Sequence, residues 1–152
     1  MIKFIIGGLP RSGTTWLSVF LTTDDCVCLH DPSAYLEKER LMAWRGGICD
    51  TGLWFLEDWC KENTDKFILI DRDVGEVSAA LDEVGLPQIP SYILNKFAVV
   101  VPNRRYFFED LYTEELAEEL WNYVHPEKPF NRERWVLLKG VYMSPIELEN
   151  GK

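Results

Sequence analysis

The feature that most constrains the fold lies near the start of the chain, where an apolar run meets a glycine-rich turn. Phe4-Ile5-Ile6 is typical of a short buried strand, and Gly7-Gly8-Leu9-Pro10-Arg11-Ser12-Gly13 follows it at once. Residues 14–23 are expected to form a helix that opens directly out of this turn. Backbone N–H groups at such a helix start are free and favour an anion. The segment therefore predicts an anion-binding loop between a strand and a helix.

The rest of the chain alternates between short apolar runs and helical stretches. Strands are expected over residues 2–7, 27–30, 67–70 and 105–108. Helical stretches are expected over residues 14–23, 32–44, 53–62, 74–84 and 113–123, with a last helix after Asn131. Residues 88–104 stay undecided, because residues 98–101 suit either a strand or the end of a helix. This alternation predicts an α/β fold with a mainly parallel sheet flanked by helices.

Length and charge limit the possible partners. A chain of 152 residues favours a single domain over residues 1–152. Its net charge of −9 disfavours nucleic acid and anionic membrane surfaces, although local donors can still bind a small anion. The longest apolar runs are too short for a bilayer span, and the N-terminus does not resemble a signal peptide, so a cytoplasmic protein is expected.

The four cysteines have neither zinc nor disulfide spacing, which favours reduced, buried thiols.

The loop differs from a nucleotide-triphosphate loop at one position. Gly8 and Gly13 have the spacing of G-x-x-x-x-G-K-[ST], but Thr14 stands in place of the lysine, with Thr15 after it. Arg11 supplies a cation from inside the loop instead. The hydroxyl groups of Ser12, Thr14 and Thr15 and the N–H groups of residues 12–16 are the candidate donors. The alternative is a glycine turn that begins a helix and binds no ligand.

Eight consecutive residues, Pro10-Arg11-Ser12-Gly13-Thr14-Thr15-Trp16-Leu17, resemble the 5′-phosphosulfate-binding loop of sulfotransferases, P-[KR]-S-G-T-T-x-L. The resemblance implies a three-layer P-loop NTPase-like fold. It also implies an enzyme that moves a sulfuryl group, without a metal, from 3′-phosphoadenosine 5′-phosphosulfate to a hydroxyl or amine of a small-molecule or glycan acceptor. A phosphosulfate carries less charge at the transferred group than a triphosphate, so loop N–H groups and one cation suffice. The implied cofactor-binding residues of the loop are Arg11, Ser12, Gly13, Thr14, Thr15 and Trp16, with Arg11 also catalytic. Trp16 packs either against the adenine or in the core.

A second segment, residues 67–77, resembles the family's strand and helix that bind the 3′-phosphate. Arg72 matches the phosphate-binding arginine, but Val74 replaces a proline and Ala80 stands where a serine is expected. Ser78 is nearby but lies on a different helix face. Without that resemblance, Arg72 suits a surface ion pair with Asp71 or Asp73. Residues 106–111 give a weaker match, in which Glu109 and Asp110 are expected to bond backbone N–H groups at a helix start.

His30-Asp31-Pro32 follows the second expected strand and is the candidate site of a general base. Asp31 matches an acidic position of the family, and His30 precedes it. Carboxyl ends of neighbouring parallel strands share one crevice, so this step should face the loop. Adjacent residues on an extended segment point oppositely, which predicts that only one of the two faces the site. Asp31 equally suits a helix N-cap before Pro32.

Three functions remain open from the sequence. The first is an active sulfotransferase. The second is an adenine-nucleotide-binding module without transfer activity, which Ala80 suggests. The third is a small kinase with an atypical loop.

Overall fold

The computed structural model of the chain describes residues 1–142, which form an α/β fold around a five-stranded parallel sheet. The strand order is β2-β3-β1-β4-β5, and all four pairings are parallel. The strands are β1 (Phe4–Gly8), β2 (Cys28–His30), β3 (Gly47–Asp50), β4 (Phe67–Asp71) and β5 (Arg104–Phe107). The predicted α/β class with a mainly parallel sheet is therefore confirmed. The predicted single domain of residues 1–152 includes residues 143–152, which lie outside the described part.

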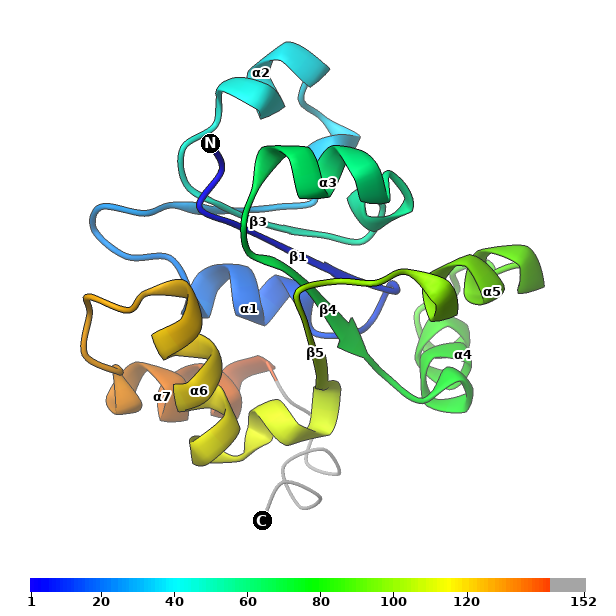
Figure 1. The fold of residues 1–152 in the computed structure, drawn as a ribbon. Helices are drawn as coiled ribbons and strands as arrows, with labels where there is room; N and C mark the ends of the chain where they lie inside the picture. Colours follow the sequence, from blue (N-terminus) through cyan, green and yellow to red (C-terminus); the bar gives the residue numbers. More distant parts are fainter. Residues whose placement is uncertain (143–152) are drawn as a thin grey trace.

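Helices cover both faces of the sheet, as Figure 1 shows. Side chains alternate along each strand, so Phe4 and Ile6 join one buried cluster while Ile5 joins the other. The first cluster packs against α1 (Thr14–Phe20), α6 (Glu114–Val124) and α7 (Arg132–Tyr142). The second packs against α3 (Glu57–Asn63), α4 (Val74–Glu83) and α5 (Ser91–Val99), and α2 (Lys38–Ala43) adds Leu41 to it. Both strand faces are therefore buried, which explains the unbroken apolar runs in β1 and β4.

Several predicted elements needed correction. Strand β3 was missed, since Gly46-Gly47 suggests only a helix end. Residues 32–44 form a 3₁₀ turn η1 (Pro32–Ala34) and the short α2 rather than one helix. The stretch over residues 53–62 is likewise divided into η2 (Leu53–Phe55) and α3. Residues 98 and 99, which suited either a strand or a helix end, form the end of helix α5. Residues 98–101 form no strand.

The two expected N-cap residues Asn131 and Thr113 make different hydrogen bonds. Asn131 caps α7, because its Oδ1 accepts from the backbone N–H of Arg134 at 3.0 Å. Thr113 precedes α6, but its hydroxyl donates backwards to the carbonyl of Asp110. The carboxylates of Glu109 and Asp110, in the turn η3 (Phe108–Tyr112), accept no backbone N–H within residues 1–142, contrary to the prediction.

The four cysteines are free and buried, as the sequence predicts. Burial raises the pKa of Cys60 to about 12 and that of Cys49 well above its ordinary value, so both stay protonated. Cys28 Sγ lies 3.5 Å from Cys49 Sγ between β2 and β3. No helix within residues 1–142 combines the length and apolar character needed to cross a bilayer.

His125 makes the stability of the fold dependent on pH. Its buried imidazole lies 2.7 Å from the Leu21 carbonyl and packs edge-on against Phe4 and Trp121. Burial lowers the pKa of His125, so the unfolded chain binds a proton more readily than the folded chain. The free energy of unfolding should therefore be highest above about pH 6.5 and fall below it, by at most ~1.4 kcal/mol per pH unit. Urea denaturation between about pH 6.5 and pH 5 should show a smaller fall in the free energy of unfolding for His125→Gln than for wild type.

Candidate functional site

A cleft of about 470 Å³ opens at the carboxyl edge of the sheet, where β1 leads into α1. Its volume lies in the range of sites for small molecules and cofactors. The loop after β1 and the segments that follow β2, β3, β4 and β5 all contribute to it. The lining residues are Pro10, Arg11, Gly13, Thr14, Thr15, Trp16, His30, Asp31, Thr51, Arg72, Leu86 and Phe108.

The loop after β1 has a special backbone conformation. Arg11 and Gly13 have φ angles of 68° and 82°, in the left-handed region. The first helical hydrogen bond of α1 runs from Leu17 N–H to the Gly13 carbonyl. The N–H groups of residues 13–16 therefore have no backbone acceptor among the described residues, as at any helix start.

Most predicted loop residues line the cleft, but Ser12 does not. Its side chain is fully buried beneath the loop, and its hydroxyl has no hydrogen-bond partner within residues 1–142. Trp16 touches the cleft but is only 3% exposed and packs on Phe20 with ring centroids 5.5 Å apart. Trp16 thus has the core position that was the alternative to an adenine contact.

Arg72, at the end of β4, reaches the same cleft. Its guanidinium donates to the backbone carbonyl of Arg11 and lies 4.2 Å above the Phe108 ring. It also makes a 3.5 Å contact with Glu76, whereas Asp71 pairs with Arg105 at 2.5 Å. Burial raises the pKa of Asp71, although Arg105 opposes the shift. Arg72 is thus positioned against the loop after β1 rather than displayed on the outer surface.

Ser78 does not supply the hydroxyl that the sulfotransferase resemblance predicts at the position of Ala80. Ser78 uses its hydroxyl to donate to Gln88 Oε1 at 2.6 Å. It lines a separate small pocket with Gln88 and not the main cleft. The Ala80 departure is therefore uncompensated by Ser78.

The His30–Asp31 step does face the loop, and both side chains line the cleft. His30 Nε2 lies 3.3 Å from Thr14 Oγ1, 3.2 Å from Thr15 Oγ1 and 3.4 Å from Asp31 Oδ2. The prediction that only one of the pair faces the site is wrong. Asp31 has a φ of 46°, and this left-handed conformation interrupts the extended backbone on which alternation depends.

The contacts of His30 exclude a relay of the serine-protease type. In such a relay the carboxylate accepts from one imidazole nitrogen while the hydroxyl approaches the other. Here Asp31 and both threonine hydroxyls approach the same nitrogen, Nε2. Asp31 and His30 are therefore neighbouring polar groups at the cleft wall, each able to meet an incoming hydroxyl.

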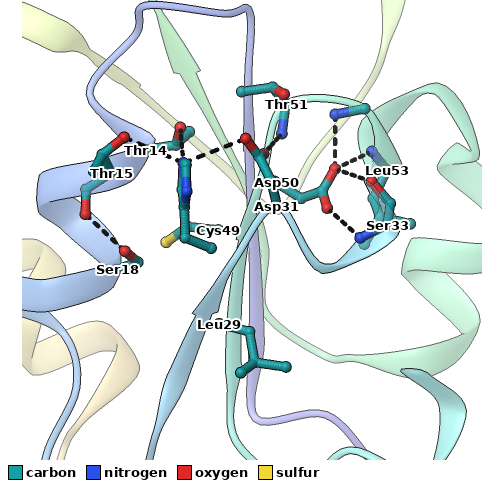
Figure 2. Close-up of polar contacts among 12 residues, drawn as sticks. Thr14, Thr15, Ser18, Leu29, Asp31, Ser33, Cys49, Asp50, Thr51 and Leu53 are labelled. Atoms are coloured by element: carbon teal, nitrogen blue, oxygen red, sulfur yellow. Dashed lines mark hydrogen bonds and ion pairs between the residues drawn. The ribbon is translucent and has the colours of Figure 1, made fainter. Parts of the chain in front are cut away.

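Asp31 is not the predicted side-chain cap of η1. Within the described residues its carboxylate makes no cap bond there, and Oδ1 instead accepts from Thr51 N–H at 2.7 Å. The cap is Asp50, whose Oδ2 accepts from Ser33 N–H at 3.0 Å. Figure 2 shows Thr14 and Thr15 on one side of this site and Asp31, Asp50 and Thr51 on the other.

Sequence reasoning missed four residues at or behind the cleft: Asp50, Thr51, Leu86 and Phe108. A signal for the first two does exist, because Asp50-Thr51-Gly52 directly follows the apolar pair Ile48-Cys49. Polar residues just after a buried parallel strand lie at the edge where α/β proteins bind ligands. Nothing in the local sequence distinguishes Leu86 or Phe108 from other exposed or core residues.

Gly13→Ala should destabilise the loop and weaken anion binding. A Cβ at Gly13 would lie 2.5 Å from Phe108 Cε2, and the φ of 82° costs a non-glycine residue ~1–2 kcal/mol before any clash. Thermal denaturation should show a clear fall in Tm. Gly140→Ala is the matched control, because its Cβ meets nothing within 4 Å and alanine favours the helix. Equal stabilities for the two variants would contradict this account of the loop.

Residues 1–142 contain no group of three or more His, Cys, Asp or Glu side chains arranged to hold a metal ion. Comparison of the chain with protein-family models, curated proteins and solved structures finds no match in any of the three.

Proposed function

We propose that the cleft binds 3′-phosphoadenosine 5′-phosphosulfate and transfers its sulfuryl group to a hydroxyl or amine of a small-molecule or glycan acceptor. The observation that carries the proposal is the convergence of Arg11, Arg72 and the loop over residues 13–15 on one cleft. Two guanidinium groups and one carboxylate, Asp31, line a site in a chain of net charge −9. Such local cationic donors suit an anionic ligand, although Glu76 lies 3.5 Å from Arg72.

The topology is compatible with a P-loop-type domain, which is part of the proposal. The loop leaves the central strand β1, between β3 and β4, and leads directly into α1. Ligands of open α/β sheets bind at this carboxyl edge. The resemblance of residues 10–17 to the 5′-phosphosulfate loop is what supports this particular ligand.

The proposed reaction breaks the bond between sulfur and the bridging oxygen of the 5′-phosphate and forms a bond from the acceptor oxygen or nitrogen to sulfur. The acceptor proton passes to Asp31 or His30, which both line the cleft. Adenosine 3′,5′-bisphosphate leaves. Arg11 and the loop N–H groups stabilise charge on the transferring group and the leaving phosphate, so the proposal needs no metal.

A nucleotide-binding module without transfer activity is the second candidate. The absence of a hydroxyl at Ala80, with Ser78 bound to Gln88, favours it because one expected phosphate donor is missing.

A transfer assay distinguishes the two functions. The protein is incubated with radiolabelled phosphosulfate donor and a panel of alcohols, phenols, sugars and amines. An active enzyme should give labelled product and adenosine 3′,5′-bisphosphate in equal amounts. Binding of the donor with no transfer to any acceptor of the panel would favour the module.

A further inference from the structure

Both oxygens of the Asp50 carboxylate accept hydrogen bonds, and the proposed reaction does not use this side chain. It ends β3, is fully buried and lies outside the cleft lining. Its Oδ1 accepts from Gly52 N–H at 2.7 Å, Leu53 N–H at 2.8 Å and Ser33 Oγ at 2.8 Å. Oδ2 accepts from Ser33 N–H at 3.0 Å. A buried carboxylate is costly unless donors surround it, and this one is surrounded.

These bonds join two turns that follow different strands. Ser33 belongs to the turn after β2, while Gly52 and Leu53 belong to the turn after β3. Figure 2 draws the bonds that Asp50 accepts from Ser33 and Leu53. Asp31 begins the turn after β2 and is bonded to β3 and to the turn after it. Its N–H donates to the Cys49 carbonyl at 2.8 Å, and its Oδ1 accepts from Thr51 N–H at 2.7 Å.

The turn around Asp31 needs such support. A non-glycine residue with a φ of 46° is in a sparsely populated conformation, which persists only when its surroundings fix it. With Oδ1 held by Thr51, Oδ2 is left 3.4 Å from His30 Nε2 at the cleft wall. Release of either turn would let this carboxylate rotate away from His30.

We propose that Asp50 is a positioning residue, which clamps the two turns together and so holds the Asp31 carboxylate against His30. Asp50 itself touches neither the cleft nor a ligand in it. The proposal deepens the proposed function, since it concerns the same site. Its main test nevertheless requires no substrate, so it stands or fails separately from sulfuryl transfer.

Asp50→Asn is the selective probe. One amide oxygen can keep the bonds to Gly52 and Leu53, but the amide NH₂ then faces the Ser33 N–H, so two donors meet where a bond existed. The turn after β3 should stay and the turn after β2 should loosen. Ser33→Ala is a milder probe that removes only the hydroxyl bond to Oδ1.

The readout is the set of imidazole nitrogen chemical shifts, which report the tautomer and hydrogen bonds of each histidine. The chain has only two histidines, so His125, buried beside Leu21 and away from the clamp, is an internal control. We expect Asp31→Asn and Asp50→Asn to move the His30 signals in the same direction and leave those of His125 in place. Ser33→Ala should move the His30 signals less. The double variant should match Asp31→Asn alone, because the clamp acts through Asp31.

Ligand binding and turnover complete the test. Affinity for adenosine 3′,5′-bisphosphate should stay within about 3-fold in Asp50→Asn, since Asp50 is behind the cleft. The value of kcat should fall by up to ~10²-fold, because the Asp31 carboxylate is then misplaced. Unchanged His30 signals in a folded Asp50→Asn protein would overturn the proposal. If that variant does not fold, unchanged signals in folded Ser33→Ala would overturn it instead. Additive effects of Asp31→Asn and Asp50→Asn on the His30 signals would also overturn the proposal.

Discussion

Arg11→Ala should lower the rate of the proposed sulfuryl transfer by about 10²-fold or more while the domain remains folded. Arg11 is exposed, lines the cleft and brings the cation that a lysine at Thr14 would otherwise supply. A charge that is fixed before the reaction stabilises the transition state without reorganisation, so its removal acts mainly on the rate. The φ of 68° strains the backbone of alanine as much as that of arginine, so the free energy of unfolding should change little.

Steady-state kinetics with two further variants make this result specific. Arg11→Lys keeps the charge but loses the planar fork of donors, and its rate should lie between those of wild type and Arg11→Ala. Arg132→Ala removes an exposed arginine of α7 that pairs with Glu114 of α6, away from the cleft, and should keep the wild-type rate. A folded Arg11→Ala protein with the wild-type rate would remove Arg11 from the mechanism.

Substitution of the general base should have an effect of the same order, and the pair His30→Gln and Asp31→Asn identifies which residue it is. General-base catalysis typically contributes ~10²–10⁴-fold. Asp31→Asn keeps the amide oxygen that can accept from Thr51 N–H, so the turn should survive while the negative charge is lost. His30→Gln retains a polar group near Thr14 and Thr15 but cannot take a proton at neutral pH.

The variant that loses the rate with little change in donor affinity marks the base. If only Asp31→Asn does so, Asp31 is the base and His30 a neighbour that positions it; the reverse result exchanges the roles. Full activity of both folded variants with a known acceptor would place the base elsewhere in the cleft.

The parts of the fold that could be predicted are those with a strong local signal. Strands β1 and β4 are unbroken apolar runs, because parallel strands covered on both faces need apolar residues on both. The loop after β1 was predicted from its glycines, and Gly13 does have the left-handed backbone that favours glycine. Strand β3 was missed because Gly47 suggests a break. The structure explains the glycine, since a Cβ there would lie 2.1 Å from Phe4 Cζ on the neighbouring strand.

The site itself could be predicted only in part, because its side chains are positioned by contacts between distant segments. Alternation along a strand gave the wrong orientation for the His30–Asp31 step, since the left-handed turn at Asp31 depends on bonds to Cys49 and Thr51. The role of Asp50 depends on Ser33, seventeen residues earlier. Arg72 was predicted as a site residue, but its contact with the Arg11 carbonyl joins segments sixty-one residues apart. Such bonds depend on which distant segments the topology of the sheet brings together. A local pattern of residues does not show this.

The central claim is that this cleft selects a 3′-phosphorylated adenine nucleotide over a nucleoside triphosphate. Titration calorimetry with adenosine 3′,5′-bisphosphate and with ATP, each with and without Mg²⁺, tests it most directly, with Arg11→Ala as the site control. We expect the bisphosphate to bind more tightly than ATP, with the same affinity whether or not Mg²⁺ is present, and to bind Arg11→Ala more weakly. Tight, Mg²⁺-dependent binding of ATP would contradict the sulfotransferase account and favour a kinase.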